Sequence, residues 1–137
     1  MSSAAHDLQA AIVAALRADT DLVALLGGED RILDRVPPDR ALPCVVIGRT
    51  AAQDWSTDDR TGEEHLVTIR GWSRATGRTE VLAVAERVTA ALVALAGVSG
   101  DTRIVSCLPV STDHGYEPAD RAWRATIRLR ALTEPAA

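Results

Sequence analysis

Apolar residues recur at helical spacing at the start of the chain. Three of them lie four positions apart, which places them on one face of a helix expected over residues 4–17. They are Leu8, Ile12 and Leu16. The polar run at residues 19–21 supplies cap-forming side chains, and a second short helix should follow and end at Gly27 and Gly28.

A longer helix is predicted over residues 80–95, where apolar residues again form one stripe. The members of this stripe are Val81, Ala85, Val88, Leu92 and Leu95. The opposite side carries charged residues such as Glu86 and Arg87, so the helix should pack on a sheet with its other side in water. Gly97 and Gly100 should end it.

A hairpin is predicted in the first half of the chain. Pro43 can open a strand because its missing N–H costs least there, and the residues after it are apolar and β-branched. Residues 51–63 are polar and rich in turn formers. Residues 65–72 then alternate, with Val67 and Ile69 on an apolar face, which is typical of a returning strand.

Three further strands are predicted. Residues 31–36 form a short one before a Pro-Pro pair, and residues 104–110 and 121–132 flank a turn-rich loop at 113–118. The last strand alternates cleanly between two faces. Its apolar set is Trp123, Ala125, Ile127, Leu129 and Ala131, and its polar set is Arg124, Thr126, Arg128 and Arg130. The sum is an α+β fold, an antiparallel sheet of about four or five strands with helices packed on one face.

The order of these segments resembles a known family. Six features follow one another: an N-terminal helix rich in Leu and Ala, a Val-Pro pair, the strand LPCVVIG, the hairpin segment DWST, the strand end GWSR and a Gly-Arg pair before a helix. This ordered set resembles the tail completion or tail terminator proteins of long non-contractile-tailed phages and related gene transfer agents. The resemblance extends over residues 8–132, and no single motif in it is a catalytic fingerprint.

The resemblance implies a structural protein. Members of this family form a six-fold ring on the head-proximal end of the tail tube, which ends polymerisation and offers a docking surface for the head. The implied partners are other copies of the chain in a homohexamer, the tail tube protein and a head-side neck protein, with DNA passing through the ring without sequence-specific binding. The implied location is the host cytoplasm during assembly and then the tail of the virion or gene transfer agent particle. A neck or head–tail joining protein is the alternative.

Composition is consistent with this class. With 137 residues and 14.5 kDa, residues 1–137 are expected to form one domain. The net charge of −4 argues against a protein that coats nucleic acid. The first residues lack the basic start and apolar core of a signal peptide, and no apolar run approaches the roughly 20 residues that span a membrane, so no membrane association is expected.

Catalytic chemistry leaves one alternative of another class. The alternative is a small thiol enzyme. In it Cys107 would be the nucleophile, and Asp113 and His114 would supply the orienting carboxylate and the base. Cys107 lies in an apolar segment without a basic neighbour, so we expect it, like Cys44, to be a buried thiol, and a disulfide between the two stays open. Because the histidines are scattered and no phosphate-binding glycine loop exists, no catalytic residue, cofactor or metal site is predicted.

The arginines of the last strand are the first candidate contact residues. Arg124, Arg128 and Arg130 share one face of that strand. They either form exposed ion pairs with carboxylates such as Glu63 and Glu64, or they meet a neighbouring protomer or the passage that DNA crosses.

The other candidates lie in predicted loops. Trp55 is an aromatic residue in a polar hairpin, where it either folds back on its own sheet or contacts a neighbouring subunit. His114 and Tyr116 belong to the turn-rich loop predicted at 113–118. The resemblance makes the region 113–120 a candidate subunit contact.

Overall fold

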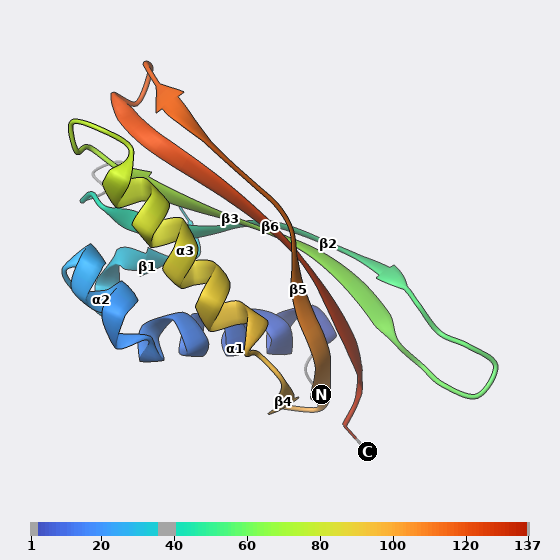
Figure 1. Ribbon diagram of the computed structural model, residues 1–137. Coiled ribbons are helices and arrows are strands. Elements are labelled where there is room, and N and C mark those ends of the chain that lie inside the picture. Colours follow the sequence, from blue (N-terminus) through green and yellow to red (C-terminus); the bar gives the residue numbers. More distant parts are fainter. Residues whose placement is uncertain (1–2, 36–40, 137) are drawn as a thin grey trace.

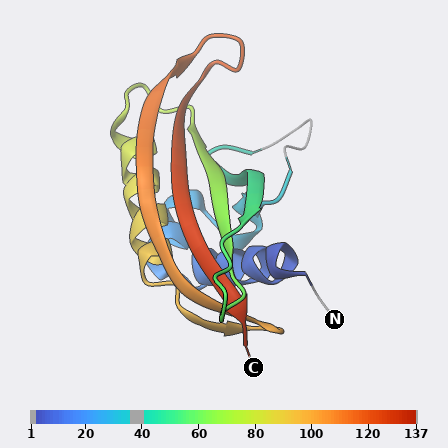
Figure 2. The ribbon, with the colours of Figure 1, turned by 90° about the vertical axis from the view of Figure 1, so that its right-hand side faces the viewer.

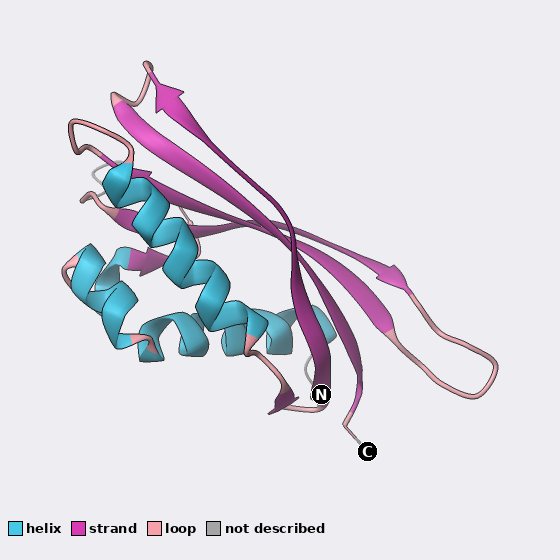
Figure 3. Cartoon of the chain, in the orientation of Figure 1, coloured by secondary structure: helices cyan, strands magenta, loops and turns pink. Residues whose placement is uncertain are grey.

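The computed structural model describes residues 3–35 and 41–136. In these residues a layer of helices packs against one β-sheet (Figures 1 and 3). In chain order the elements are α1 (Ala4–Ala18), α2 (Thr20–Leu26), a 3-10 helix η1 (Glu29–Arg31), β1 (Ile32–Leu33), β2 (Cys44–Asp54), β3 (Glu63–Ser73), α3 (Thr79–Val93), β4 (Gly97–Ser99), β5 (Thr102–Glu117) and β6 (Ala122–Pro135).

The described strands form one six-stranded sheet in the order β1-β2-β3-β6-β5-β4. Neighbouring strands are antiparallel except for β1 and β2, which run parallel. The α+β class is as predicted, but the expected four or five strands were too few. β1 has two residues and β4 has three, which is too short for an alternating pattern to show. The strand predicted at 31–36 is correspondingly shorter, and its last residue lies outside the described residues.

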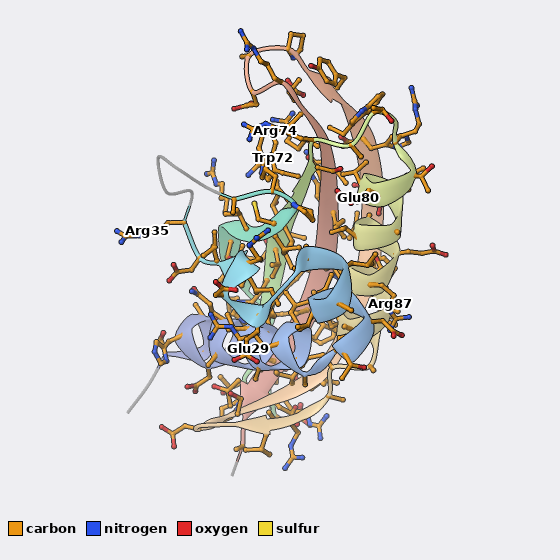
Figure 4. The ribbon with its side chains drawn as sticks, turned by 90° about the vertical axis from the view of Figure 1, so that its left-hand side faces the viewer. Glu29, Arg35, Trp72, Arg74, Glu80 and Arg87 are labelled. Atoms are coloured by element: carbon orange, nitrogen blue, oxygen red, sulfur yellow. The ribbon has the colours of Figure 1, made fainter. Side chains whose placement is uncertain are left out.

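The α-helices cover one face of the sheet and leave the other open, as Figure 2 shows from the open side and Figure 4 from the helix side. The predicted apolar stripes of α1 and α3 point into this layer. The buried members are Leu8, Ile12, Leu16, Val81, Ala85, Val88 and Leu92. Each large side chain buried in this way contributes about 1.5–3 kcal/mol relative to exposure. The helix predicted to reach residue 95 ends at Val93, so Leu95 packs on the core from the following turn.

On the sheet side of this core, every second residue of a strand points toward the helices. Val67 and Ile69 of β3 are buried against the helices, as predicted. On β6 the buried members are Ala125, Ile127, Leu129 and Ala131, while Trp123 of the same face is only partly buried. The period of two in the sequence therefore identified the helix-covered face correctly.

A second, smaller apolar cluster lies on the open face. Cys44 and Trp72 are register partners on β2 and β3, and they pack with Val46 and Ala122. The guanidinium of Arg124 lies 5.5 Å from the centroid of the Trp72 ring. This end of the open face is thus covered by an aromatic residue and a cation rather than by a helix.

Both long hairpins reach further than their sequences predicted. β2 continues to Asp54, so the connection to β3 spans only residues 55–62. The loop predicted at 113–118 is wrong: β5 continues to Glu117, and the chain turns at residues 118–121. Pairing of His114 with Ala125 and of Tyr116 with Trp123 on β6 extends a segment whose composition favours a turn, because backbone pairing with a neighbouring strand outweighs local propensity.

Helix α1 is joined to the β4–β5 turn through a buried carboxylate. Asp7 is almost completely buried, and its Oδ2 accepts from Thr102 Oγ1 at 2.7 Å and from the Asp101 N–H at 3.3 Å. Gly100, with φ of +58°, holds the turn against this carboxylate. A β-carbon at Gly100 would lie 2.5 Å from Asp7 Oδ1, so only glycine fits both the backbone conformation and the space.

Helix α3 is joined to the α1–α2 junction by an ion pair. Arg87 Nη2 donates to Asp19 Oδ2 at 2.7 Å, while Asp19 Oδ1 accepts from the Leu22 N–H and caps α2. The hydrogen bond from Arg87 holds the pKa of Asp19 below its ordinary value. One carboxylate therefore fixes the relative positions of all three α-helices.

We predict that Gly100→Ala lowers the free energy of unfolding by about 2 kcal/mol or more, because a left-handed backbone conformation with a β-carbon adds to the clash with Asp7. Chemical denaturation of the variant measures this. Gly77→Ala is the matched control, since nothing lies within 4 Å of a β-carbon there, and it should change stability by no more than about 0.5 kcal/mol. Equal losses of stability in the two variants would contradict the inference that only glycine fits at position 100.

Candidate functional site

The arginines of β6 are paired with carboxylates on the next strand. Arg124 Nη2 lies 2.9 Å from Glu117 Oε1, and Arg128 Nη1 lies 3.0 Å from Asp113 Oδ2. Glu117 and Asp113 belong to β5, so both pairs cross between neighbouring strands of the open face. The side chains remain between a third and two thirds exposed, so each pair contributes about 0–1 kcal/mol.

Arg130 is paired on the opposite side, with β3. Its Nε donates to Glu64 Oε2, and Gln53 Nε2 donates to the other oxygen of Glu64 at 2.7 Å. The hydrogen bond from Arg130 is the main cause that lowers the pKa of Glu64. Glu64 is thus one of the two partners expected for these arginines. The other, Glu63, instead lies 3.5 Å from the ring of His65.

The three ion pairs neutralise the arginines of β6 on the open face. Each of these arginines is opposed by a carboxylate within 3.0 Å, whereas Arg70 of β3, on the same face, has no carboxylate partner among the described residues. Thr126, predicted on the same face, is buried between them. Paired arginines attract phosphate groups weakly, since counterion release depends on unneutralised cations.

Exposed leucines flank Arg130 on this face, and sequence reasoning did not single them out. Leu66 and Leu108 are its register partners on β3 and β5, and they are 50% and 55% exposed. The signal was present for Leu66, which the alternation placed on the open face with Thr68 and Arg70. Apolar side chains held beside ion pairs are typical of a surface that contacts another protein.

The end of β2, the start of β3 and the connection between them form a projecting arm, which we define as residues 49–64. Trp55 is the first residue of that connection. The arm extends beyond the helix layer (Figure 1). Its tip is closed by hydrogen bonds from the Trp55 N–H to Gly62 O and from the Thr57 N–H to Arg60 O, both at 2.8 Å. The indole lies against Gly62 and is 53% exposed. The tip is therefore ordered before any partner binds, and Trp55 is displayed on it.

His114 and Tyr116 lie at the opposite end of the sheet, in a cation–aromatic cluster. Arg78 Nη1 donates to His114 Nε2 at 3.2 Å, and the Arg78 guanidinium lies 4.8 Å from the centroid of the Trp123 ring. Tyr116 meets the same indole edge to face at 5.5 Å and remains half exposed. Sequence reasoning named two of these four residues. It missed Arg78 and Trp123 because the contact joins segments 45 residues apart.

A cavity of about 170 Å³ lies where β3 begins and β6 ends. Thr133, which lines it, lies 2.9 Å from Nε2 of the buried His65. Burial lowers the pKa of His65, so the imidazole is neutral near pH 7. Within residues 3–35 and 41–136, no group of three or more His, Cys, Asp or Glu side chains is arranged to hold a metal ion.

The arrangement of Cys107 does not support a thiol enzyme. Cys107 pairs with Ala131 and His114 with Ala125, so roughly 20 Å of strand β5 separates them. Burial raises the pKa of the Cys107 thiol to about 11. Cys44 is also buried, and neither cysteine is in a disulfide, which answers the open question of a bond between them. A catalytic cysteine needs a stabilised thiolate, and this environment disfavours one.

These features define a small α+β protein whose distinctive surfaces are suited to protein contacts: a projecting arm, an ion-paired open face and a cation–aromatic cluster. None of the helices in the described residues is long and apolar enough to span a membrane. The family model for tail completion protein gp17 matches residues 10–134, and the chain belongs to this family.

A solved structure is similar along almost the whole chain. It is a chain from the "Virion of native gene transfer agent (GTA) particle", with a TM-score of 0.86 and 29% sequence identity. The match covers 98% of this chain and 99% of that one. A comparison with curated proteins found no match. The resemblance inferred from the ordered motifs is thereby confirmed.

We predict that both thiols are inert in the folded protein. At pH 8 the Cys107 thiol is almost fully protonated and both sulfurs are buried, so Ellman's reagent should release little chromophore until denaturant is added, and then two equivalents per chain. Ser106→Cys supplies a matched control, a thiol on the partly exposed open face, which should react within minutes. Rapid reaction of native Cys107 would revive the thiol-enzyme alternative.

Proposed function

We propose that this protein is a structural component of the tail of a phage or gene transfer agent particle. In this proposal it forms a homohexameric ring that caps the head-proximal end of the tail tube, ends tube polymerisation and provides the head-docking surface. The observation that carries the proposal is the near-complete match, in length and in fold, to a chain of a gene transfer agent virion. Membership in the tail completion family supports the same role.

The physical basis of termination is a mismatch between two surfaces of one ring. A growing tube end presents unpaired subunit surfaces, which act as the template for the next layer. A ring that fits those surfaces below and differs above removes the template. Specificity then depends as much on the mismatch as on the match.

The proposed partners follow from this position. Other copies of the chain complete the ring, the tube protein lies below it, a neck protein lies on the head side, and DNA passes through without sequence-specific binding. The pairing of the three β6 arginines supports passive passage, since paired arginines hold phosphate weakly. The protein would assemble in the host cytoplasm and remain in the tail of the particle.

We further propose that the candidate residues contact other subunits or the lumen. Trp55 is exposed on an ordered arm, and exposed aromatic residues are typical anchors of protein interfaces. The open face offers Arg124, Arg128 and Arg130, and the cation–aromatic cluster offers His114 and Tyr116. Trp55 lies at the β2–β3 hairpin, the three arginines lie on the open face, and His114 and Tyr116 lie on β5 close to its turn into β6.

Deletion of the gene from the genome that encodes it tests the function. We expect overlong tails without heads, because an uncapped tube continues to grow and lacks a docking surface. Electron microscopy of the particles measures tail length and head attachment. Tails of normal length that lack heads would indicate the neck role instead, and intact, functional particles would contradict both.

Arg128→Glu tests the role of the open face. The variant places a carboxylate beside Asp113, the diagonal neighbour of residue 128 on β5, and neighbouring like charges repel. If the open face is a contact or lumen surface, complementation of the deletion with this variant should yield fewer headed particles. The charge-swapped pair Arg128→Glu with Asp113→Arg restores the local ion pair and controls for folding. Normal particles from the single variant would remove the proposed role of Arg128.

A further inference from the structure

We propose that the arm of one protomer docks on the cation–aromatic end of the next, so that subunits join head to tail through two different surfaces. The inference rests on the proposed ring and specifies how its subunits recognise each other. The two surfaces are the arm, residues 49–64, and the basic end, which we define as residues 70–80 and 113–128. Each of these two surfaces binds another copy of this chain.

The arm is acidic. Residues 49–64 carry five carboxylates and two arginines. Of the carboxylates, Glu64 is neutralised by Arg130, whereas the others have no arginine or lysine partner among the described residues. These are Asp54, Asp58, Asp59 and Glu63. The arm therefore presents negative charge around the exposed indole of Trp55.

The basic end has the opposite sign. Residues 70–80 and 113–128 together carry six arginines and four carboxylates. Arg78 forms its described contacts with His114 and Trp123 and has no carboxylate partner within the described residues. A guanidinium already oriented by an aromatic ring and an imidazole loses little entropy on binding a carboxylate. Tyr116, half exposed beside it, offers apolar surface of the kind that an indole covers.

The two surfaces cannot meet within one chain. Strand β6 pairs with Ser73 and Tyr116 at Trp123 and with Glu63 at Thr133, so roughly 30 Å of strand separates the basic end from the base of the arm. They lie at opposite ends of the sheet in both views (Figures 1 and 2). Complementary surfaces at opposite ends of one rigid body form a heterologous contact, which closes into a ring when the rotation per subunit permits.

Charge reversal tests the inference. The arm variant is Asp58→Arg with Asp59→Arg, and the basic-end variant is Arg74→Glu with Arg78→Glu. Each alone should weaken self-association by roughly tenfold or more, because like charges then face each other. Sedimentation velocity on the full-length protein measures this. Glu86→Arg, an exposed reversal on α3, is the control and should leave association unchanged, as should the circular dichroism of every variant.

The decisive sample is an equimolar mixture of the two variants. Each variant keeps one native surface, so the native arm of one fits the native basic end of the other, and the two reversed surfaces fit each other. Association should therefore return in the mixture although both components fail alone. A contact between two arms would leave the basic-end variant associating normally by itself, and a contact between two basic ends would leave the arm variant doing so. Normal association of either variant alone, or no recovery in the mixture, would overturn the proposal.

The same proteins can be scored in the particle if the wild type remains monomeric in solution. Expressed singly in the deletion strain, the two variants should fail to restore normal tails, and expressed together they should restore them. Normal tails from either variant alone would overturn the docking inference while the terminator role stands. Intact particles after deletion would instead refute the proposed function itself, so the two failures are distinguishable.

Discussion

The structure depends on the pairing of β3 with β6. Eleven residue pairs join them, from Glu63 opposite Thr133 to Ser73 opposite Trp123, without a bulge. Side chains alternate between the two faces of a strand, so a slip of one residue would move the buried side chains of the slipped strand, Ile69 or Ile127 among them, from the helix-covered face to water. The register is therefore fixed by burial, and the positions of all other surface groups follow from it.

One consequence is that the two faces meet different constraints. The helix-covered face is buried by packing, and Asp7 and Asp19 hold the helices on it. The open face has no helix, so the arginines of β6 are balanced by carboxylates on the flanking strands, and Trp72 is buried under a cation at one end. Charge that the sequence shows as a stripe of arginines is thus largely neutral in the fold.

The sequence predicted the parts of the fold that repeat a period over many residues. The stripe of α3 and the alternation of β6 have five members each, enough to identify the buried face. Two-residue β1 and three-residue β4 contain no period to detect. The segment from His114 to Glu117 has the composition of a turn, and only its pairing with β6 makes it a strand. Arg78 was not predicted as a neighbour of Trp123, because that contact depends on how the start of α3 lies over the end of the sheet.

Strand edges also constrain how copies of this fold can associate. Beyond β4 the outer edge of β5 is long, and a long regular edge invites unspecific pairing with another chain. Here β5 contains Pro109 and two shifts in its pairing register with β6. Strand β2 has one such shift in its register with β3, between Ile47 and Thr50. Bulges and proline break the run of free backbone groups that an added strand needs. Association through side chains at the hairpin ends is then favoured over edge pairing, and it can be limited to one partner geometry, which a ring of defined size requires.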